Sequence, residues 1–575
     1  TAMATMYTLG ASNAPTVQSA LKNAIVILNP FYNPDGHERF TVWYNALALG
    51  SPEGFALEQD EPSLINGRGN HYRFDMNRDK LAQSQDETKA ETAAFLQWNP
   101  QVFADLHGQP EVYFFPPNSL PVHSSTDRAR VERWTSVFGK ANAAAFDKFG
   151  WNYVTREIFD LFYPGYLDSF TTLSGAIGMT YETDAGGSLS RRRSDGTVIT
   201  LKDAALHHFE ASLATITAAA ENREALLKDF AAYKKTACAK PGFVALQPGP
   251  RATALASLLK SMGIEVGVLQ TSQSRTDAVH YGEKKVSTIT LPAGALIVPF
   301  GQPQGALARA ILEPDPQIEE KFVKEQLARR ERNEKKGERE PKEWYEFYDL
   351  TAWSLPLTYD VEAYFVDGAT VPATVPFSLE TAKEAGVNRK ARVAYVWRFD
   401  SDGAGQLAVA LLQKGQKLQV ATKPLVLEGD AGSWPRGTFI TRVERAADAE
   451  ALYMQLDTLA KKYGVTVRAV DSSYGAPGLG SDSVMTVRTP AVALIAGEGV
   501  RFSGLWFYLE RVLGIPFTMV QPGRVNDQLL SQFNVLLLPE GARLSKGENE
   551  ALKAWMQRGG CAIAIGRVVG GLTDK

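Results

Sequence analysis

The stretch VFADLH, residues 102–107, decides the fold class of this chain. It is an apolar run that contains Asp105 and ends at His107, a pattern typical of a buried strand with polar side chains where it ends. In open α/β sheets, ligands collect in the crevice outside the carboxyl ends of the strands. His107 is therefore expected to face such a crevice.

Two other apolar runs lead to polar residues in the same way. The run AIVIL (24–28) precedes NPDG (33–36), and AIGMTY (176–181) is followed directly by Glu182. Side chains at three strand ends can converge on one substrate even when they are far apart in the sequence. The sequence thus predicts a site assembled from these pieces.

Strand-like runs alternate with helical patterns through residues 1–235, which is the rhythm of an α/β domain. A helix is predicted over 85–98, where Ser84 and Glu87 have the spacing of a capping box. A closing helix, rich in Ala and Leu, is expected over about 202–234.

The length of 575 residues exceeds a single hydrophobic core and predicts about three or four domains. We expect a mixed-sheet α/β domain, a small α/β unit with a charged helix, a β-rich domain and a flavodoxin-like domain. Their expected ranges are 1–235, 241–365, 370–488 and 489–575. The chain is expected to be incomplete at both ends, because it begins at Thr1 without an initiator Met and stops after a Gly-rich turn.

Particular segments support this division. Residues 316–345 are dense in both charge signs, which favours a solvated helix with i,i+4 ion pairs over a binding arm. The runs RVAYVW, QLAVALL and GTFITRV, between 392 and 443, are predicted to be strands of the β-rich domain. The order strand, helix, strand, strand, helix, strand after residue 489 fits a flavodoxin-like sheet.

Composition excludes several classes of function. The formal net charge is −3, from 61 basic and 64 acidic residues, so nothing draws the chain generally to nucleic acid or to an anionic membrane. No apolar run reaches the 18 or so residues of a membrane-spanning helix. The two cysteines, Cys238 and Cys561, form neither a disulfide framework nor a zinc-type pair.

The polar residues at the strand ends suit metal-assisted hydrolysis. His107 is a candidate metal ligand, with Asp105 two residues away, and Glu182 is a candidate base for a metal-bound water. Asn77 and Arg78 place an amide beside a guanidinium that can bind a carboxylate through two hydrogen bonds. Taken singly, each of these residues also has a purely structural interpretation, as a packed His, a salt-bridged Glu or a surface Arg.

Four motifs in order, NPDG (33–36), DMNR (75–78), DLH (105–107) and TYE (180–182), resemble the signature of the carboxypeptidase A-like zinc metallocarboxypeptidases. The resemblance covers about residues 1–235. It implies an α/β/α fold with a mixed central sheet, and a zinc ion held by a His-x-x-Glu motif and a later His.

The resemblance also implies roles for the matching residues. His107 corresponds to the third zinc ligand, Glu182 to the glutamate that activates water, and Asn77 with Arg78 to the pair that holds the substrate's terminal carboxylate.

Two further roles have competing candidates. Arg68 is the first choice for the arginine that polarises the scissile carbonyl, with Arg39 and Arg73 as competitors. Tyr166 is the nearest match to a tyrosine that closes over the substrate, with Tyr163 second.

The chain departs from the family pattern at its start. In the family, His-x-x-Glu precedes NPDG; here residues 1–9 resemble the helix that follows it, so the first two zinc ligands are expected before Thr1. The sequence HHFE (207–210) has the right spacing, but it comes after Glu182. We interpret it as an amphipathic helix face with polar residues at the surface.

The last segment also resembles a known class, the class I glutamine amidotransferase-like domains. Cys561 lies in GGCAI (559–563), which lacks the second glycine of their catalytic elbow, so we expect a buried apolar cysteine and no amidotransferase chemistry. The stretch AGEG (496–499) is weak evidence for a dinucleotide site, because Phe502 replaces the third glycine of that fingerprint.

The sequence therefore predicts a zinc-dependent metallocarboxypeptidase that hydrolyses peptide bonds at or near the C-terminus of a peptide or protein substrate. The alternative is a non-catalytic peptide-binding protein that keeps the cleft and lacks the metal, and a third possibility is that the trailing domains form a docking array. The resemblance suggests a periplasmic or extracellular location. Residues 1–575 alone are expected to have little activity.

Overall fold

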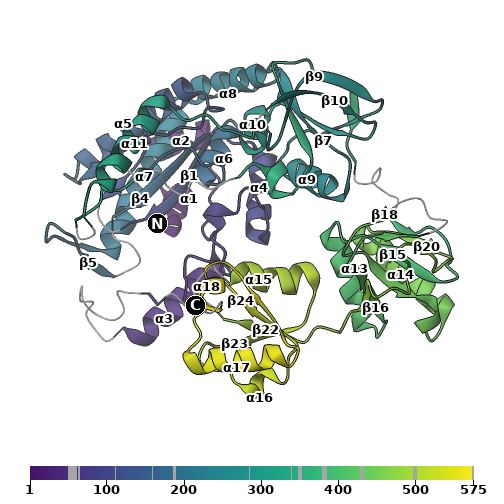
Figure 1. Cartoon of the computed structure of the whole chain (residues 1–575). Helices are drawn as coiled ribbons and strands as arrows, with labels where there is room; N and C mark the ends of the chain where they lie inside the picture. Colours follow the sequence, from purple (N-terminus) through teal and green to yellow (C-terminus); the bar gives the residue numbers. More distant parts are fainter. Residues whose placement is uncertain are drawn as a thin grey trace. The chain divides into compact units, whose positions relative to one another are not determined.

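The computed structural model of the chain describes residues 1–48, 61–62, 65–109, 112–157, 159–184, 189–283, 285–337, 340–346, 353–378, 385–427, 433–496 and 502–572. Two compact units are present (Figure 1). The first comprises Thr1–Asn70 and Asp75–Phe377, and the second comprises His71–Phe74 and Ser378–Lys575. Each is described by itself below. The four predicted domain boundaries stay predictions.

A four-stranded mixed sheet lies in the first unit, in the order β1-β4-β2-β3. Strands β1 and β4 are parallel, and their register places His107 beside Glu182; β2 is antiparallel to β4 and parallel to β3. The strands predicted at 102–106 and 176–181 are thus confirmed. The bounds are β1 (Val102–Gly108), β2 (Tyr113–Phe114), β3 (Tyr153–Val154) and β4 (Ile177–Thr183).

Helices bury the faces of this sheet. Helices α5 (Arg128–Asp147) and α7 (Leu201–Glu221) pack against each other and against β4, and aromatic side chains such as Phe138 and Phe146 are completely buried there. Each fully buried side chain of this size contributes about 1.5–3 kcal/mol to folding. The short helix α6 (Leu167–Leu173) contacts both β1 and β4. The ends of β1 and β4 are thereby held rigidly.

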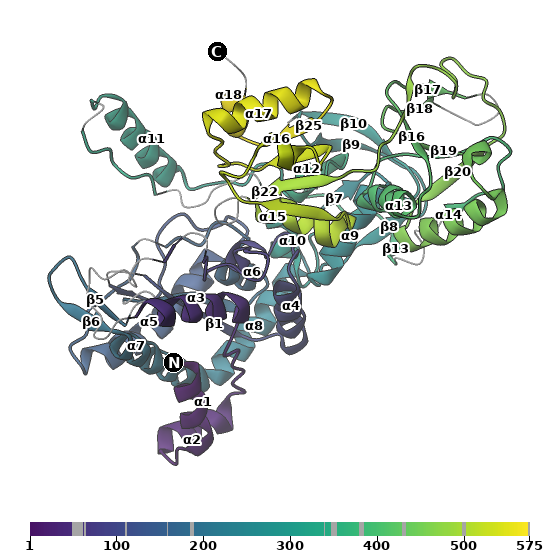
Figure 2. The ribbon, with the colours of Figure 1, turned by 90° about the horizontal axis from the view of Figure 1, so that it is seen from below.

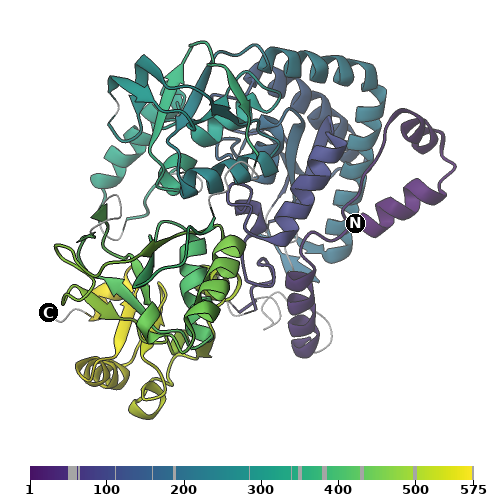
Figure 3. The ribbon, with the colours of Figure 1, turned by 90° about the vertical axis from the view of Figure 1, so that its right-hand side faces the viewer.

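The closing helix is two helices rather than one. Helix α7 begins at a capping box formed by Thr200 and Asp203, and α8 (Arg223–Ala237) follows it after a break at Asn222. The side-chain amide of Asn222 donates to the carbonyl of Ala218 at 2.8 Å, and such local hydrogen bonds compete with the backbone bonds of a helix. Helices α1 (Ala2–Ala11) and α2 (Pro15–Asn23) contact α7, at the margin of the first unit on the right of Figure 3.

The run at 24–28 is not a strand, so this prediction is wrong. Ile25 and Ile27 are exposed, and among the described residues no strand pairs with this segment. A strand must satisfy its backbone donors and acceptors through a neighbour, and an apolar run alone does not supply one. The segment instead leads in an extended form toward α3 (Pro34–Leu47).

The helix predicted over 85–98 is confirmed as α4 (Asp86–Trp98), but its predicted cap is wrong. The carboxylate of Asp79 accepts from the backbone N–H groups of Ser84 and Gln85, at 3.1 and 2.9 Å, and from the Ser84 hydroxyl at 2.6 Å. Glu87 contacts the side-chain amide of Asn70 at 3.1 Å. The Asp79 carboxylate thus fixes the turn that leads into α4, while the N-cap residue Gln85 makes no side-chain cap hydrogen bond.

A seven-stranded sheet, also in the first unit, has the order β10-β9-β12-β7-β11-β8-β13, and its neighbouring strands are antiparallel. Its strands are β7 (Gly242–Leu246), β8 (Gly267–Leu269), β9 (Gln273–His280), β10 (Val286–Leu291), β11 (Leu296–Pro299), β12 (Ala363–Asp367) and β13 (Thr374–Pro376). Helices α9 (Pro250–Ser261), α10 (Gly305–Leu312) and α12 (Leu355–Thr358) accompany it. The predicted charged helix is α11 (Glu320–Glu334), which lies away from these strands in Figures 1 and 2.

A six-stranded sheet in the second unit has the order β14-β20-β15-β19-β16-β21. Its strands are β14 (Gly386–Val387), β15 (Ala394–Trp397), β16 (Leu418–Ala421), β19 (Phe439–Arg442), β20 (Thr466–Val470) and β21 (Val484–Thr486). QLAVALL is not a strand but part of α13 (Asp402–Gln413), which packs with α14 (Ala449–Tyr463). This region is therefore α/β rather than β-rich.

The last sheet is parallel, in the order β23-β22-β24-β25. Its strands are β22 (Val492–Ile495), β23 (Phe517–Val520), β24 (Val535–Leu538) and β25 (Cys561–Ala564), with helices α15 (Ser503–Phe507), α16 (Asp527–Leu530) and α17 (Lys546–Gln557) and a π-helix at Tyr508–Leu513. Cys561 is exposed, not buried as predicted. It lies on an edge strand, where Ala562 and Ala564 pack against the core and the alternate side chains face outward.

The weak dinucleotide-site signal at 496–499 falls partly outside the described residues, because both of its glycines do. Among the helices that the structure describes, none combines the length and the apolar character needed to cross a membrane.

Candidate active site

The NPDG motif begins a helix and supports a loop. Asn33 caps α3, because its side-chain oxygen accepts from the Gly36 N–H at 2.9 Å, and Pro34 occupies the first turn. The Asn33 amide also donates to the carbonyls of Gly67 and Arg68, at 3.1 and 2.9 Å. The motif therefore fixes the loop that carries Arg68.

Arg39 holds the same loop from the side. Its guanidinium donates to the carbonyls of Ile65 (3.0 Å), Asn66 (3.0 Å) and Asn70 (2.8 Å), and also to that of Gly69. A guanidinium occupied by four carbonyls is a structural support, so Arg39 does not compete with Arg68 for the substrate. No sequence pattern indicates this role, because the contacts span 26 to 31 residues.

Of the three arginines considered for the scissile carbonyl, Arg68 lines the candidate site. Its Nε lies 2.7 Å from a carboxylate oxygen of Asp75, and about half of its side chain is exposed. Arg73, the other competitor, belongs to the segment that groups with the second unit. Of the three arginines considered, the structure thus favours Arg68 by position.

Asn77 joins three parts of the site. It lies in the short 3-10 helix Met76–Arg78, whose first turn is capped by the Asp75 carboxylate at 3.0 Å from the Asn77 N–H. The Asn77 side-chain oxygen accepts from the backbone N–H of Leu167, at the start of α6, at 2.8 Å. Its amide nitrogen lies 3.5 Å from Nε2 of His107.

Arg78 and Tyr166 form a stacked pair. The guanidinium carbon of Arg78 lies 4.5 Å from the centre of the Tyr166 ring, a distance typical of a cation–π interaction. Tyr166 is buried and also contacts the ring of Tyr163 edge-on, with 5.0 Å between the ring centres. The ring therefore orients the guanidinium from beneath.

His107 is half-buried at the end of β1 and contacts the Asp105 carboxylate through Nε2. Burial by itself would lower the pKa of His107, but the neighbouring Asp105 carboxylate outweighs it and raises that pKa to about 9. The backbone carbonyl of His107 accepts from Nε2 of His208 at 2.6 Å. Within the described part of the chain no hydrogen bond reaches Nδ1 of His107, which leaves that nitrogen able to bind a metal ion.

Glu182 is a half-buried carboxylate on β4, beside His107 in the parallel register. Burial raises its pKa to about 7, and the positive charge of His107 only partly offsets this. No described side chain or backbone group hydrogen-bonds or pairs with this carboxylate. A carboxyl group with such a pKa suits the exchange of protons near neutral pH.

The structure adds residues that sequence reasoning missed. Asp168, on α6, is buried; its carboxylate accepts from the Thr180 hydroxyl at 2.8 Å, and burial raises its pKa to about 6. Asp160 and Phe159 also line the site. The available signal was the stretch YPGYLD (163–168), in which only the tyrosines were considered.

All six predicted site residues line one small pocket of ≈ 70 Å³. The pocket walls are Arg68, Asn77, Arg78, His107, Tyr166 and Glu182, together with Phe159, Asp160, Asp168 and Thr180. The pocket thus combines two arginines, an imidazole and a base of raised pKa, from elements that span more than 100 residues of sequence. The arrangement can bind a carboxylate and transfer a proton beside it.

The pair His207 and His208 is buried, so the prediction that these residues lie at the surface is wrong. His207 Nδ1 lies 2.9 Å from the Asp184 carboxylate, and His208 Nδ1 lies 2.7 Å from the hydroxyl of Tyr113. They occupy the face of α7 that packs on the sheet. Burial lowers the pKa of His208 to about 4, so its ring is neutral and positions the end of β1.

The metal requires separate consideration. In the part of the chain that the structure describes, no three His, Cys, Asp or Glu side chains are grouped so that they could hold a metal ion. His107 is the predicted zinc ligand among the described residues, and it has a carboxylate on one ring nitrogen, as many metal-binding histidines do. A catalytic zinc normally has three protein ligands, so the described residues account for one of them.

Comparison with known proteins identifies a similar family for the first part of the chain. The family model for zinc carboxypeptidases matches residues 1–188, which include every candidate residue, and this match supports a carboxypeptidase-type function for that part. No curated protein matches the chain. The later segment's resemblance to amidotransferase-like domains receives no support.

Two solved structures are similar to part of the chain. One is a metallo-carboxypeptidase from Burkholderia cenocepacia, with 15% identity and a TM-score of 0.26 over 39% of this chain and 52% of that one. The other is a metallo-carboxypeptidase from Pseudomonas aeruginosa in complex with (2-guanidinoethylmercapto)succinic acid, with 16% identity and a TM-score of 0.26 over 39% and 53% of the chains. This chain spans about half the length of each.

Proposed function

We propose that the first unit is the catalytic part of a zinc-dependent metallocarboxypeptidase that removes residues from the C-terminus of peptides. The observation that carries the proposal is the gathering of Arg68, Asn77, Arg78, His107 and Glu182 around one pocket. The motifs that contain them are ordered as in that family, and the zinc carboxypeptidase model matches the same part of the chain.

Recognition of the substrate terminus falls to Asn77 and Arg78. A guanidinium binds a carboxylate through two parallel hydrogen bonds. The Tyr166 ring beneath Arg78 already restricts that side chain, so binding costs less conformational entropy. Asn77 is fixed by the Leu167 N–H, so its amide group stays at the pocket wall. The small pocket volume suits the end of a chain rather than its middle.

The residues of the pocket also suit hydrolysis. When bound, zinc would supply the positive charge that makes a water acidic, with His107 as one ligand. Glu182 accepts a proton from the attacking water and returns it to the leaving amine, because its raised pKa allows both transfers. Arg68 stabilises the negative charge that develops on the scissile carbonyl oxygen.

The experiment compares the zinc-loaded full-length protein with its Glu182→Gln variant on N-blocked dipeptides. Loss of a general base lowers kcat by about 10²–10⁴-fold. The matched control is Glu210→Gln on α7, which does not line the pocket and should leave kcat unchanged. Equal hydrolysis by Glu182→Gln and the parent protein contradicts the proposal. A full-length protein that binds peptides but no zinc would instead be the non-catalytic binder.

A further inference from the structure

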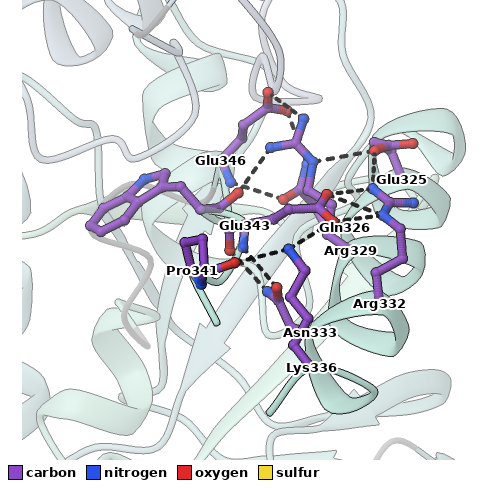
Figure 4. A network of polar contacts seen from close by, with 10 residues as sticks. Glu325, Gln326, Arg329, Arg332, Asn333, Lys336, Pro341, Glu343 and Glu346 are labelled. Carbon is purple, nitrogen blue, oxygen red and sulfur yellow. Dashed lines mark hydrogen bonds and ion pairs between the residues drawn. The ribbon is translucent and has the colours of Figure 1, made fainter. Parts of the chain in front are cut away.

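A brace of side chains fixes the segment 340–346 against α11 (Figure 4). Asn333 bonds the backbone of Glu343 in both directions, donating to its carbonyl at 2.9 Å and accepting from its N–H at 2.7 Å. Gln326 accepts from the Glu346 N–H at 2.8 Å. Both amide side chains are buried and lie seven residues apart, on the same face of the helix.

Arginines of α11 complete the brace. Arg332 makes a two-bond contact with the Glu343 carboxylate, at 2.8 and 2.9 Å, and Arg329 pairs with Glu346 at 2.7 Å (Figure 4). Arg329 also donates to the backbone carbonyl of Trp344 at 2.9 Å. The backbone is therefore held at residue 344 and on both sides of it.

The indole of Trp344 is nevertheless exposed, with 80% of its surface accessible. A large aromatic side chain on a fixed backbone loses little conformational freedom when it binds, and tryptophan is enriched among residues that dominate binding energy. The brace thus presents a preorganised aromatic contact to a partner.

Trp344 lines a groove of ≈ 1450 Å³ within the first unit. On one side are the segment 118–122, the first turns of α5 and residues of the segment 156–161; on the other are α11 and the braced segment. Glu319 links the two sides, because its carboxylate accepts from the Val122 N–H and pairs with Arg128, both at 3.3 Å. The groove is thus a feature of one folded unit.

The groove and the candidate active pocket share a wall. Glu157 and Leu161 line the groove, whereas Phe159 and Asp160, between them, line the pocket. The wall is fixed by hydrogen bonds from the Ser119 N–H to the Phe159 carbonyl, at 2.8 Å, and from the Leu161 N–H to the Pro121 carbonyl, at 3.0 Å. The groove and the pocket are therefore lined by neighbouring residues of the same segment.

The chemistry of the groove fits a polypeptide. Its volume exceeds the roughly 300–1,000 Å³ of small-molecule sites. Five of its lining residues are Glu and five are Lys or Arg, so it lacks the positive excess that a nucleic acid requires. Apolar side chains such as Leu120, Val131 and Phe322 lie among these charges. Both peptide side chains and backbone groups would find partners there.

We infer that this groove binds the part of a polypeptide substrate that lies upstream of its C-terminal residue, with Trp344 as the main apolar contact. The inference rests on the proposed function and deepens it, since it identifies long peptides or unfolded protein ends as the preferred substrates over dipeptides. Trp344 lies outside the reacting pocket, so it contributes to binding alone.

The test uses two substrates with the same C-terminal residue, a blocked dipeptide and a peptide of about ten residues, which extends over about 33 Å. Trp344→Ala should lower kcat/KM for the long peptide by about tenfold, equivalent to roughly 1.4 kcal/mol, and leave the dipeptide unchanged. Trp98→Ala is the matched control, because Trp98 is 52% exposed at the end of α4 and does not line the groove. An equal effect on both substrates, or none, overturns the inference.

Binding of the same long peptide, labelled with a fluorophore and followed by anisotropy, separates the two proposals. If the parent protein hydrolyses neither substrate, the proposed function fails. The groove is then still supported when Trp344→Ala weakens peptide binding about tenfold and Trp98→Ala does not. Equal binding by all three proteins overturns it.

Discussion

Gly36 lies directly against the carbonyl oxygen of Gly67, and a Cβ atom at position 36 would be only 2.1 Å from that oxygen. The approach lets the NPDG turn hold the loop that carries Arg68. No side chain fits there without displacement of the backbone.

We predict that Gly36→Ala lowers the thermal stability of the first unit and reduces hydrolysis, because the loop at 65–70 must move away. Overpacking of this kind typically costs about 1–3 kcal/mol. Thermal unfolding and kcat/KM measure the two effects. Gly10→Ala is the control, since a Cβ there meets nothing within 4 Å and alanine favours a helix. Unchanged stability in Gly36→Ala would show that the close approach is not maintained in solution.

The start of α4 provides a second prediction. Asp79→Ala removes three hydrogen bonds to Ser84 and Gln85, whereas Ser84→Ala removes one of them. Loss of the Asp79 carboxylate leaves the N–H groups of Ser84 and Gln85 without this acceptor and should lower the free energy of unfolding by about 1–3 kcal/mol, and loss of the Ser84 hydroxyl alone should cost less. Denaturant unfolding of both variants checks the order. A larger loss of stability in Ser84→Ala than in Asp79→Ala would contradict this prediction.

The stacked pair at the pocket gives a third prediction. Tyr166→Phe keeps a ring beneath Arg78, so KM should stay within about twofold, whereas Tyr166→Leu loses an interaction of roughly 0.5–2 kcal/mol and should raise KM. Steady-state kinetics on one blocked dipeptide separates the two variants. A fall in kcat in Tyr166→Phe would instead show that the phenolic hydroxyl takes part in the reaction.

His123 and Glu313 make the stability depend on pH. His123 Nε2 lies 3.4 Å from Glu313 Oε1, and both side chains are buried. Burial raises the pKa of Glu313 from 4.5 to about 7, and lowers that of His123 from 6.5 to about 4. Arg309 faces Glu313 at 3.6 Å and pairs with Asp367.

The two groups act in opposite directions. The folded state binds the Glu313 proton more tightly than the unfolded chain does. The contribution of Glu313 to the free energy of unfolding is therefore complete below pH 4.5 and is lost as the pH rises toward 7. The folded state binds a proton on His123 more weakly than the unfolded chain does. The contribution of His123 to the free energy of unfolding is therefore complete above pH 6.5 and is lost as the pH falls toward 4. Between pH 4.5 and 6.5 the slopes oppose each other.

We therefore predict that the Tm of Glu313→Gln, relative to that of the parent protein, rises from pH 5 to pH 7, because only the parent loses the stability of the protonated carboxyl. The corresponding change in the free energy of unfolding, variant relative to parent, is at most about 3 kcal/mol, at roughly 1.4 kcal/mol per pKa unit. Thermal melts at both pH values measure it, with Glu224→Gln, an exposed glutamate, as the control. A difference in Tm that does not change with pH contradicts the prediction.

The gathering of the candidate residues around one pocket was more predictable than some of the elements around it. Apolar runs that end in Asp105, His107 and Glu182 identify strand ends, and strand ends of a parallel pair meet because their register is shared. The contacts of Arg39 and Asp168 could not be predicted, because they depend on loops and helices brought together only by folding. Among the residues that the structure describes, no strand lies beside 24–28, and the prediction of a strand there is therefore wrong.

Local sequence patterns led to wrong predictions where an apolar run fits both a strand and a helix. In α13, which contains QLAVALL, the buried residues Ala404, Leu407, Ala408 and Leu411 follow the helical spacing i, i+3, i+4 and i+7. Ser401 caps this helix, so the apolar run alone was insufficient to identify the element. His207 and His208 were assigned to the surface because they are polar. Hydrogen bonds to Asp184 and Tyr113 allow both to be buried, and such partners are far away in the sequence.

The brace that presents Trp344 depends at its centre on neutral groups, the buried amides of Asn333 and Gln326, and only at its margin on exposed ion pairs. Mobile ions screen the marginal pairs and leave amide-to-backbone bonds almost untouched. Concentrated salt should therefore weaken the exposed ion pairs while the backbone at residues 343 and 346 stays in position, so the placement of the indole should persist across a wide range of ionic strength.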